Sequence, residues 1–330
     1  MPRNPESKSK PYVLIPMPSE RPKVDFVVTH EKFAGLTGRL ELNFEVVSEY
    51  LFVGSGAYEF DPNARGNRPD VWHTFYRRNG QICVPGTSIK GAIRAIVEAI
   101  SNSCVSQFRR GKEKLGLKEH RPCRFENEKS QLCPACRLFG TTGFRGRVHF
   151  SDFLPQPEAK LEIVKIGELW EPRRYDPTKR RFYERKSFQP VGDLRLKSGF
   201  RFVEAVPKGA KFRGTLNFEN LSKAELGLIF YALGWKVDAD QVKIAFAPKI
   251  GGAKPRCFGS VNFRPVRLLL WNGDLKGLLT PQEMVGNELL SFLSSCLQGC
   301  QESDLLHKDS WEALVQGFMP KNEPCPQGLY

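Results

Sequence analysis

The sequence has no run of about 18 consecutive apolar residues, the length that a helix needs to cross a bilayer. Its first ten residues are polar and basic, and no apolar stretch follows them as it would in a secretory signal peptide. Internal repeats and low-complexity tracts are also missing. We therefore expect a cytoplasmic protein without a membrane partner.

The sequence also lacks the residue spacing of nucleophilic enzymes. Its five histidines do not combine with serine, cysteine or aspartate in the pattern of a catalytic triad or dyad. His149 and Asp152 are close in the chain, but residues of opposite parity on a strand point to opposite faces of a sheet. The residues alone therefore give no convincing catalytic constellation.

Acidic residues are scarce in all but the last part of the chain. The 330 residues carry a net charge of +14. Residues 271–330 contain eight acidic and three basic residues, so this tail has a net charge of −5 and residues 1–270 have +19. Such an uneven distribution favours a polyanion, nucleic acid, as the partner of the basic part over a role in solubility alone.

The nine cysteines are an odd number, and a cytoplasmic setting disfavours disulfides. Five of them are scattered and are interpreted as buried or incidental thiols: Cys83, Cys257, Cys296, Cys300 and Cys325.

The other four cysteines lie in one segment. Cys133 and Cys136 have the Cys-x2-Cys spacing of half a zinc site, and Cys123 supplies a third thiolate. The fourth ligand is His120, with Cys104 as the alternative. A site with four protein ligands leaves no open position for water, so we expect a structural Zn²⁺ that holds an irregular segment together.

Apolar periodicity predicts an α+β fold. We expect strands at residues 38–47, 72–76, 147–153, 212–218 and 258–270, a long loop at 54–70, and helices at 89–100, 223–235, 281–299 and 304–317. The core order is strand, helix, strand, strand, helix, strand, which indicates a ferredoxin-like or RNA-recognition-motif-like arrangement with large insertions.

The start of the first predicted helix carries cations. A Pro-Gly turn at 85–86 precedes Thr87 and Ser88, either of which can serve as N-cap, and Lys90 and Arg94 follow. Cations here oppose the helix dipole and repel each other at i, i+4. A bound anion would compensate by accepting backbone N–H and hydroxyl hydrogen bonds. The alternative is a solvated basic face.

Two further segments have the composition of a phosphate or RNA contact. The loop at 250–259 (IGGAKPRCFG) combines glycines with Lys254 and Arg256, although it is equally consistent with a tight turn. Residues 173–186 (RRYDPTKRRFYERK) include Arg180 and Arg181 and interleave basic with aromatic residues. This pattern suits single-stranded RNA, and a solvated hairpin is the alternative.

Asp61 and Asp70 lie in the expected long loop. An exposed loop carboxylate can hold a divalent cation or position a 2′-hydroxyl group. Turn formation by Asp-Pro and Pro-Asp is the simpler explanation for each.

Four motifs in order resemble the RAMP superfamily of CRISPR proteins, which serve in antiviral defence. They are VPGTSIKGAIR (84–94), CRLFGTTGFRGRVHFSD (136–152), FVEAVPKGAKFRGTLNF (202–218) and IGGAKPRCFGSVNF (250–263). Within that superfamily the chain looks most like the zinc-bearing kind of backbone subunit of type III effector complexes.

Residues 1–24 are rich in proline, serine and charge and are expected to form an arm. The resemblance implies an RRM-like domain at 25–270. The acidic helical tail at 271–330 lies outside the shared motifs and is expected to dock to a neighbouring subunit. The domain would carry a zinc segment at 104–142 and a thumb hairpin at 158–205. The implied partners are CRISPR RNA, target RNA and other effector subunits. The implied RNA contacts are Gly86, Thr87, Ser88, Lys90, Arg94, Arg180, Arg181, Gly251, Gly252, Lys254 and Arg256.

Many such subunits cut target RNA with a loop aspartate and a divalent cation such as Mg²⁺. Here the loop is longer than usual, so Asp70 is the first candidate and Asp61 the second. The residues leave two alternatives open. One is an endoribonuclease that processes precursor guide RNA, for which His73 is the candidate general base. The other is a stand-alone, zinc-stapled RNA-binding protein.

Overall fold

The computed structural model describes residues 11–18, 21–66, 68–105, 120–157, 159–169, 179–190, 198–271 and 273–326. The predicted core order is confirmed, and so is the mixed α and β character of the chain. The core elements are β3 (Leu36–Val46), α1 (Gly86–Ile100), β12 (Val148–Phe150), β18 (Lys211–Leu221), α3 (Lys223–Ala232) and β21 (Val261–Trp271).

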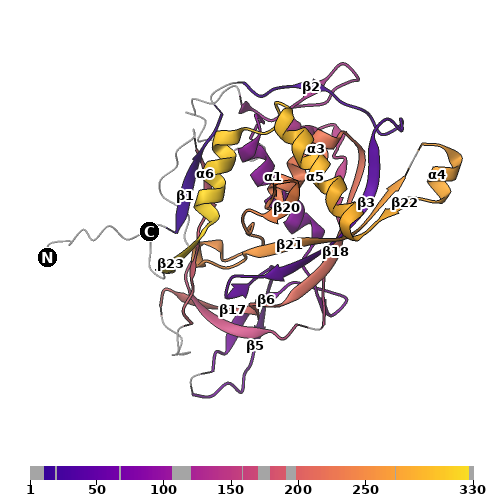
Figure 1. Ribbon diagram of the computed structural model, residues 1–330. Coiled ribbons are helices and arrows are strands. Elements are labelled where there is room, and N and C mark those ends of the chain that lie inside the picture. Colours follow the sequence, from indigo (N-terminus) through magenta and orange to yellow (C-terminus); the bar gives the residue numbers. More distant parts are fainter. Residues whose placement is uncertain are drawn as a thin grey trace.

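The core strands form one antiparallel sheet, which we call the main sheet. Its order is β12-β18-β3-β21-β22, with β22 at Gln282–Met284, and β13 (Leu154–Pro155) also pairs with β18. In Figure 1 the helices lie above this sheet, and strands β17, β6 and β5 lie below it. The central strand β3 alternates buried Leu40, Leu42 and Phe44 with polar residues, as its sequence predicts.

Helix α1 forms because its isoleucines recur at helical spacing. Ile89, Ile93, Ile96 and Ile100 are all buried, which confirms the predicted apolar face. The helix begins earlier than expected, at Gly86, and its N-cap residue is Pro85 without a side-chain cap. The expectation that Thr87 or Ser88 caps it was wrong, because both residues lie inside the first turn.

The second sheet has the order β14-β17-β6-β5, and β4 (Tyr50–Leu51) pairs with β17. Its strands are β14 (Glu162–Gly167), β17 (Phe200–Pro207), β6 (Val71–Phe75) and β5 (Gly54–Phe60). Residues 54–60 are therefore a strand rather than part of a long loop. The error has a local cause: Gly56 has φ +86°, and a register shift lies between Gly54 and Tyr58.

The charged segment at 158–205 is more than a hairpin. Its outer strands β14 and β17 pair with each other, but its inner strands pair with the chain termini. Strand β15 (Lys179–Tyr183) pairs with β1 (Tyr12–Pro16), and β16 (Arg185–Ser187) runs parallel to β23 (Pro320–Pro324). Residues 170–178 and 191–197 of the expected thumb lie outside the described residues.

The C-terminal region packs onto the body. Helix α5 (Gly286–Glu302) packs on α3, α6 (Lys308–Phe318) packs on α1, and both helices contribute to the same apolar core as the main sheet. The predicted arm and the predicted extension therefore both contact the predicted RRM-like domain. No helix in the described ranges has the length and apolar character needed to span a membrane.

Short elements complete the description. The strands are β2 (Asp25–Phe26), β7 (Arg77–Arg78), β8 (Gln81–Ile82), β9 (Gln131–Leu132), β10 (Gly140–Thr141), β11 (Phe144–Arg145), β19 (Trp235–Asp238) and β20 (Gln241–Ile244). The helical segments are α2 (Pro134–Phe139), η2 (Lys254–Arg256) and α4 (Leu275–Leu279).

One disulfide contradicts the expectation of free thiols. Cys257 and Cys325 are bonded, with their sulfurs 2.03 Å apart. The pairing of β23 with β16 carries the C-terminal segment to the glycine-rich loop, which brings the two residues together although they are 68 positions apart in the sequence. The scattered Cys83, Cys296 and Cys300 are buried free thiols, as expected.

Candidate nucleic-acid interface and metal centre

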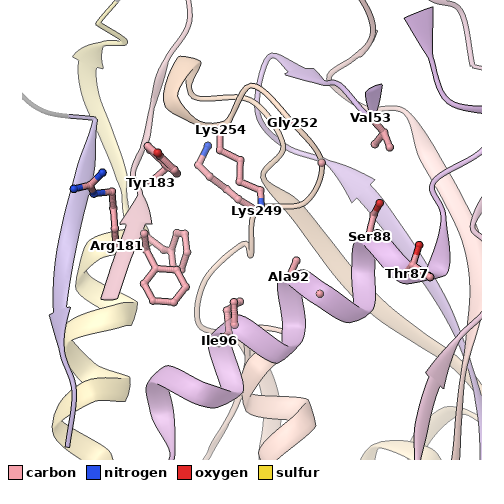
Figure 2. A pocket seen from close by; sticks show the side chains of 15 residues that line it. Val53, Thr87, Ser88, Ala92, Ile96, Arg181, Tyr183, Lys249, Gly252 and Lys254 are labelled. Atoms are coloured by element: carbon pink, nitrogen blue, oxygen red, sulfur yellow. The ribbon is translucent and has the colours of Figure 1, made fainter. Parts of the chain in front are cut away.

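Three motifs that are far apart in the sequence meet at one groove. The groove has a volume of about 440 Å³ and lies between α1, β15 and the glycine-rich loop (Figure 2). We call it the α1–β15 groove. None of the described residues that line it is acidic. Six candidate RNA contacts line it: Thr87, Ser88, Arg181, Gly251, Gly252 and Lys254.

The loop side of the groove concentrates positive charge. Lys249 is almost fully buried, and its Nζ donates to the carbonyl oxygen of Phe258 at 2.9 Å. Burial, with the nearby charges of Lys254 and Arg185, lowers the pKa of Lys249 well below its usual value. Burial also lowers the pKa of Lys254 to about 8, and no carboxylate among the described residues pairs with its ammonium group. A bound phosphate would offset the repulsion between the neighbouring positive charges of this loop.

The helix side of the groove is lined by small and hydroxyl-bearing residues. Thr87 is exposed and Ser88 is half-buried, so both hydroxyl groups can reach a ligand in the groove. Gly91 and Ala92 follow on the same face, and a Cβ atom added at Gly91 would meet nothing within 4 Å. A mid-helix glycine costs about 0.5–1 kcal/mol relative to alanine. Packing within the chain does not require a glycine at this position, and Gly91 leaves free space beside the helix.

The strand side supplies aromatic rings. Phe182 and Tyr183 of β15 line the groove, and RNA bases stack on such rings. The Arg181 guanidinium group stacks on the ring of Tyr12, 4.3 Å from its centroid. Figure 2 shows this group turned away from Lys254, toward β1. Arg181 thus contributes mainly its aliphatic stem to the groove.

Two of the candidate glycines are required by the fold itself. A Cβ atom on Gly86 would lie 2.0 Å from the carbonyl oxygen of Phe150. Gly251 has φ +75°, and its Cβ atom would lie 2.2 Å from the carbonyl oxygen of Phe52. Close backbone approach within the chain explains both positions without an RNA ligand.

The start of α1 already has an anion. The Gly86 N–H donates to Oδ1 of Asp152 at 3.0 Å, and Asp152 Oδ2 forms a 2.6 Å ion pair with Arg78. Asp152 lies just beyond β12. The chain itself therefore supplies a carboxylate that offsets the positive end of the helix dipole, in addition to any bound ligand. The sequence suggested Asp152 only as a neighbour of His149, because it is the tertiary structure that brings its carboxylate to Gly86.

Lys90 lies outside the α1–β15 groove. Burial, together with the charges of Arg94 and Arg145, lowers the pKa of Lys90, and no carboxylate among the described residues pairs with it. His149 is close enough to Lys90 for that charge to lower the pKa of His149, after burial as the main cause. Lys90 is therefore an unpaired cation on a second face of α1.

Three candidate arginines have internal partners. Arg94 Nε donates to Glu98 Oε1 at 2.9 Å, and Arg180 Nη2 lies 2.8 Å from Glu98 Oε2. Arg256 is 1% exposed and donates to the carbonyl oxygens of Gly167, Glu168 and Pro326. These arginines stabilise the fold, and none of the three lines the groove.

Four cysteine sulfurs converge at the end of α1. The Sγ atoms of Cys104, Cys123, Cys133 and Cys136 lie within 4.8 Å of one another. The Cys104 sulfur is 3.3 Å from that of Cys136 and 3.5 Å from that of Cys133. Hydrogen bonds from the neighbouring thiols, chiefly Cys104, lower the pKa of Cys133. Backbone N–H groups of Cys104 and Cys133 donate to sulfurs at 3.4 Å, as they do around thiolates.

His120 was the wrong fourth ligand, since Cys104 completes the cluster. Cys104 directly follows the turn after α1, which carries its sulfur to the start of α2 beside Cys136. His120 is buried, but its Nδ1 lies 3.3 Å from the carbonyl oxygen of Ser103 and its ring is not in the cluster. Residues 106–119, between these two positions, lie outside the described residues.

The cluster fits a tetrahedral metal ion. Four thiolates at Zn–S bonds of about 2.3 Å have sulfurs about 3.8 Å apart, close to the spacing found here. Arg94 Nη2 donates to the Cys136 sulfur at 3.8 Å and offsets part of the negative charge of such a centre. The donor set is compatible with zinc, and its four ligands leave no position for a substrate.

The candidate catalytic residues lie away from the groove. Asp61 and Asp70 face each other at the end of the β5–β6 hairpin, where the Asp61 N–H donates to the carbonyl oxygen of Asp70 at 2.8 Å. Asp61 Oδ1 accepts from the Asn63 N–H. In Figure 1 this hairpin extends from the side of the molecule opposite the helices. His73 lies on β6 with its ring 4.3 Å from that of Tyr58, and burial and Arg201 lower its pKa.

The sequence reasoning missed the groove positions Gly91, Ala92 and Lys249. Thr87, Gly91 and Ala95 recur every four residues along one face of α1, and this run of small residues opposite the isoleucines was a usable signal. Lys249 gave no such signal, because its burial depends on the path of the loop.

Substitutions at the cluster test the ligand assignment. We expect purified Cys104→Ser protein to contain much less zinc than wild type, because it lacks one of four ligands. His120→Gln should retain the wild-type zinc content, measured by inductively coupled plasma mass spectrometry. Loss of zinc in His120→Gln with retention in Cys104→Ser would overturn the assignment.

The lowered pKa of Lys254 predicts a pH-dependent affinity for RNA. The free ammonium group loses its proton above pH about 8, and phosphate favours the protonated form. Affinity for single-stranded RNA should therefore fall as pH rises above about 8, by up to about tenfold per unit. Lys254→Arg should remove most of this fall at constant salt, since arginine stays charged. An equal fall in both proteins, measured by fluorescence anisotropy, would rule out Lys254 as its source.

Comparison with known proteins agrees with the four motifs. Residues 43–262 match the family model of the RAMP superfamily. The chain is also 25% identical over 195 residues to the "CRISPR system Cms endoribonuclease Csm3" of Methanocaldococcus jannaschii. That match covers 58% of this chain and 66% of the relative, just under two thirds of its length. Because the family match spans more than half of the chain, the protein is a member of the RAMP superfamily.

Proposed function

We propose that the protein is a guide-RNA-binding backbone subunit of a type III CRISPR effector complex. The observation that carries the proposal is the α1–β15 groove, where cations, hydroxyl groups and aromatic rings from three motifs meet without an acidic residue among the described lining. Membership of the RAMP superfamily and similarity to a protein named Csm3 support the CRISPR context.

In this proposal the groove holds the RNA backbone against its cationic loop. Phosphate oxygens would accept from Lys254, from the Ser88 hydroxyl and from backbone N–H groups of the loop. Bases would stack on Phe182 or Tyr183, which requires no particular sequence. Lys90, unpaired on its separate face of α1, would contact a neighbouring phosphate. Arg94, Arg180 and Arg256 are left out of this contact set because they have internal partners.

We infer that the main sheet with α1 and α3 is the ferredoxin-like palm of the superfamily. The supporting observation is the sheet order β12-β18-β3-β21, which matches the split β-α-β-β-α-β arrangement. The four cysteines would hold zinc, which when bound serves as a structural cross-link between the end of α1 and α2. Other effector subunits and target RNA are the further partners in this proposal.

Target-RNA cleavage is a second part of the proposal, favoured by similarity to a protein named as an endoribonuclease. Asp70, and secondarily Asp61, would bind Mg²⁺ or another divalent cation at the exposed hairpin tip and promote cleavage there. Asp70 is exposed, which suits a substrate that arrives from solution.

Filling the groove should weaken RNA binding without unfolding the protein. Gly91→Glu adds bulk and negative charge at a position with free space, and it replaces a mid-helix glycine with a better helix former. We expect affinity for single-stranded RNA to fall at least about tenfold, or 1.4 kcal/mol. Resistance to urea should not fall.

The matched control is Asn287→Glu, which adds the same charge in the exposed first turn of α5. Its RNA affinity should equal that of the wild type in the same fluorescence anisotropy assay. Wild-type affinity in Gly91→Glu would exclude the groove as the binding site. Purification from the native operon with sequencing of bound RNA would separate the alternatives: guide RNA with sister proteins supports a subunit, and neither supports a stand-alone binder.

The cleavage assignment has its own test. Asp70→Ala in the purified complex should abolish cutting of target RNA at one position while guide-RNA content stays unchanged. Unchanged cutting would exclude Asp70 and direct the test to Asp61→Ala. Cutting of repeat RNA by the isolated protein, lost in His73→Ala, would instead support precursor processing.

A further inference from the structure

A buried ion-pair network links the cysteine cluster to the α1–β15 groove. Its centre is Glu98 on α1, whose side chain is only 2% exposed. One carboxylate oxygen accepts from Arg94 Nε at 2.9 Å, and the other lies 2.8 Å from Arg180 Nη2. The two arginines come from different elements, α1 and β15. Glu98 therefore connects the helix side and the strand side of the groove from beneath.

Arg94 extends the network to the metal ligands. Its Nη1 donates to the carbonyl oxygen of Gly140 at 2.9 Å, and its Nη2 donates to the Cys136 sulfur at 3.8 Å. A zinc ion with four thiolates has a net charge of −2, so a loaded cluster attracts the guanidinium group.

Arg180 extends the network to the groove. It immediately precedes Arg181, Phe182 and Tyr183, which line the groove. Strand β15 belongs to a two-stranded sheet with β1, so neither large sheet holds it in place. The Arg180–Glu98 ion pair connects β15 to α1. The Phe182 ring also contacts that of Phe318, with centroids 5.8 Å apart.

We propose that Arg94, Glu98 and Arg180 form a relay through which the loaded cysteine cluster positions β15 across the groove. Arg180 is then a positioning residue for RNA binding rather than a phosphate contact. Linkage is reciprocal, so metal strengthens RNA binding and RNA strengthens metal retention. The inference rests on the proposed function of the groove.

The test combines RNA affinity, its salt dependence and zinc release in the full-length protein. Arg180→Met should weaken binding of a single-stranded RNA oligonucleotide about fivefold or more. It should leave the slope of log affinity against log salt unchanged, because no phosphate contact is lost. Lys254→Met, a direct contact, should lower that slope by about one counterion. Lys211→Met removes an exposed charge from β18, outside the proposed contact set, and should change affinity little.

Zinc release to a chromophoric chelator reports the reciprocal effect. Saturating RNA should slow zinc release from the wild type but not from Arg180→Met. Arg180→Met removes one cation from beside the buried Glu98 carboxylate. The variant Glu98→Leu/Arg180→Met, which removes this ion pair as a whole, therefore controls for misfolding. It should show the same loss of linkage, whereas Arg180→Lys should restore part of it.

The outcomes distinguish failure of the relay from failure of the proposed RNA-binding function of the groove. Absence of RNA binding by the wild type would overturn the proposed function and the relay together. RNA binding with wild-type affinity in Arg180→Met, or zinc release that RNA does not slow in the wild type, would overturn the relay alone. A lowered salt slope in Arg180→Met would make Arg180 a phosphate contact and would also overturn the relay.

Discussion

Burial of the isoleucine face of α1 against the main sheet is the constraint on which the rest of the molecule depends. Successive helical residues are turned by about 100°, so fixing Ile89, Ile93 and Ile96 inward fixes every other direction. The small residues then face β15 and form one side of the groove. Arg94 and Glu98 point toward the cysteine cluster and the underside of β15. One hydrophobic contact therefore orients both candidate sites.

The positive charge of this chain has two distinct locations. Part of it lies inside, where arginines bind carboxylates and carbonyl groups: Arg147 donates to Glu225 and to the Asn220 carbonyl oxygen, much as Arg256 donates to three carbonyl oxygens. The Arg147 and Arg256 guanidinium groups are stable there because their fork of donors reaches several oxygens at once. Among the described residues no carboxylate pairs with the lysines of the groove, which is why Lys254 rather than Arg256 is the better phosphate contact.

The acidic C-terminal region belongs to the body in structural terms. Helix α6 packs on α1 and supplies Phe318 to the groove, while β23 and the Cys257–Cys325 disulfide hold the chain end against the glycine-rich loop. The apolar faces of α5 and α6 are buried within the chain. A neighbouring subunit that docks to this region would meet its charged residues together with the exposed side chains of Leu279, Val285 and Leu290.

The sequence by itself determined the elements whose signal is local. These are the helical period of α1, the alternation in β3, the order of the core elements along the chain and the Cys133-x2-Cys136 pair. The four motifs added the resemblance to the RAMP superfamily. Only the tertiary structure decided which residues meet: Cys104 in place of His120, Asp152 at the start of α1, and internal partners for Arg94, Arg180 and Arg256. The reason is physical. The spacing of apolar residues can be read directly from the sequence, whereas the partners of a charge or a sulfur depend on how distant segments pack.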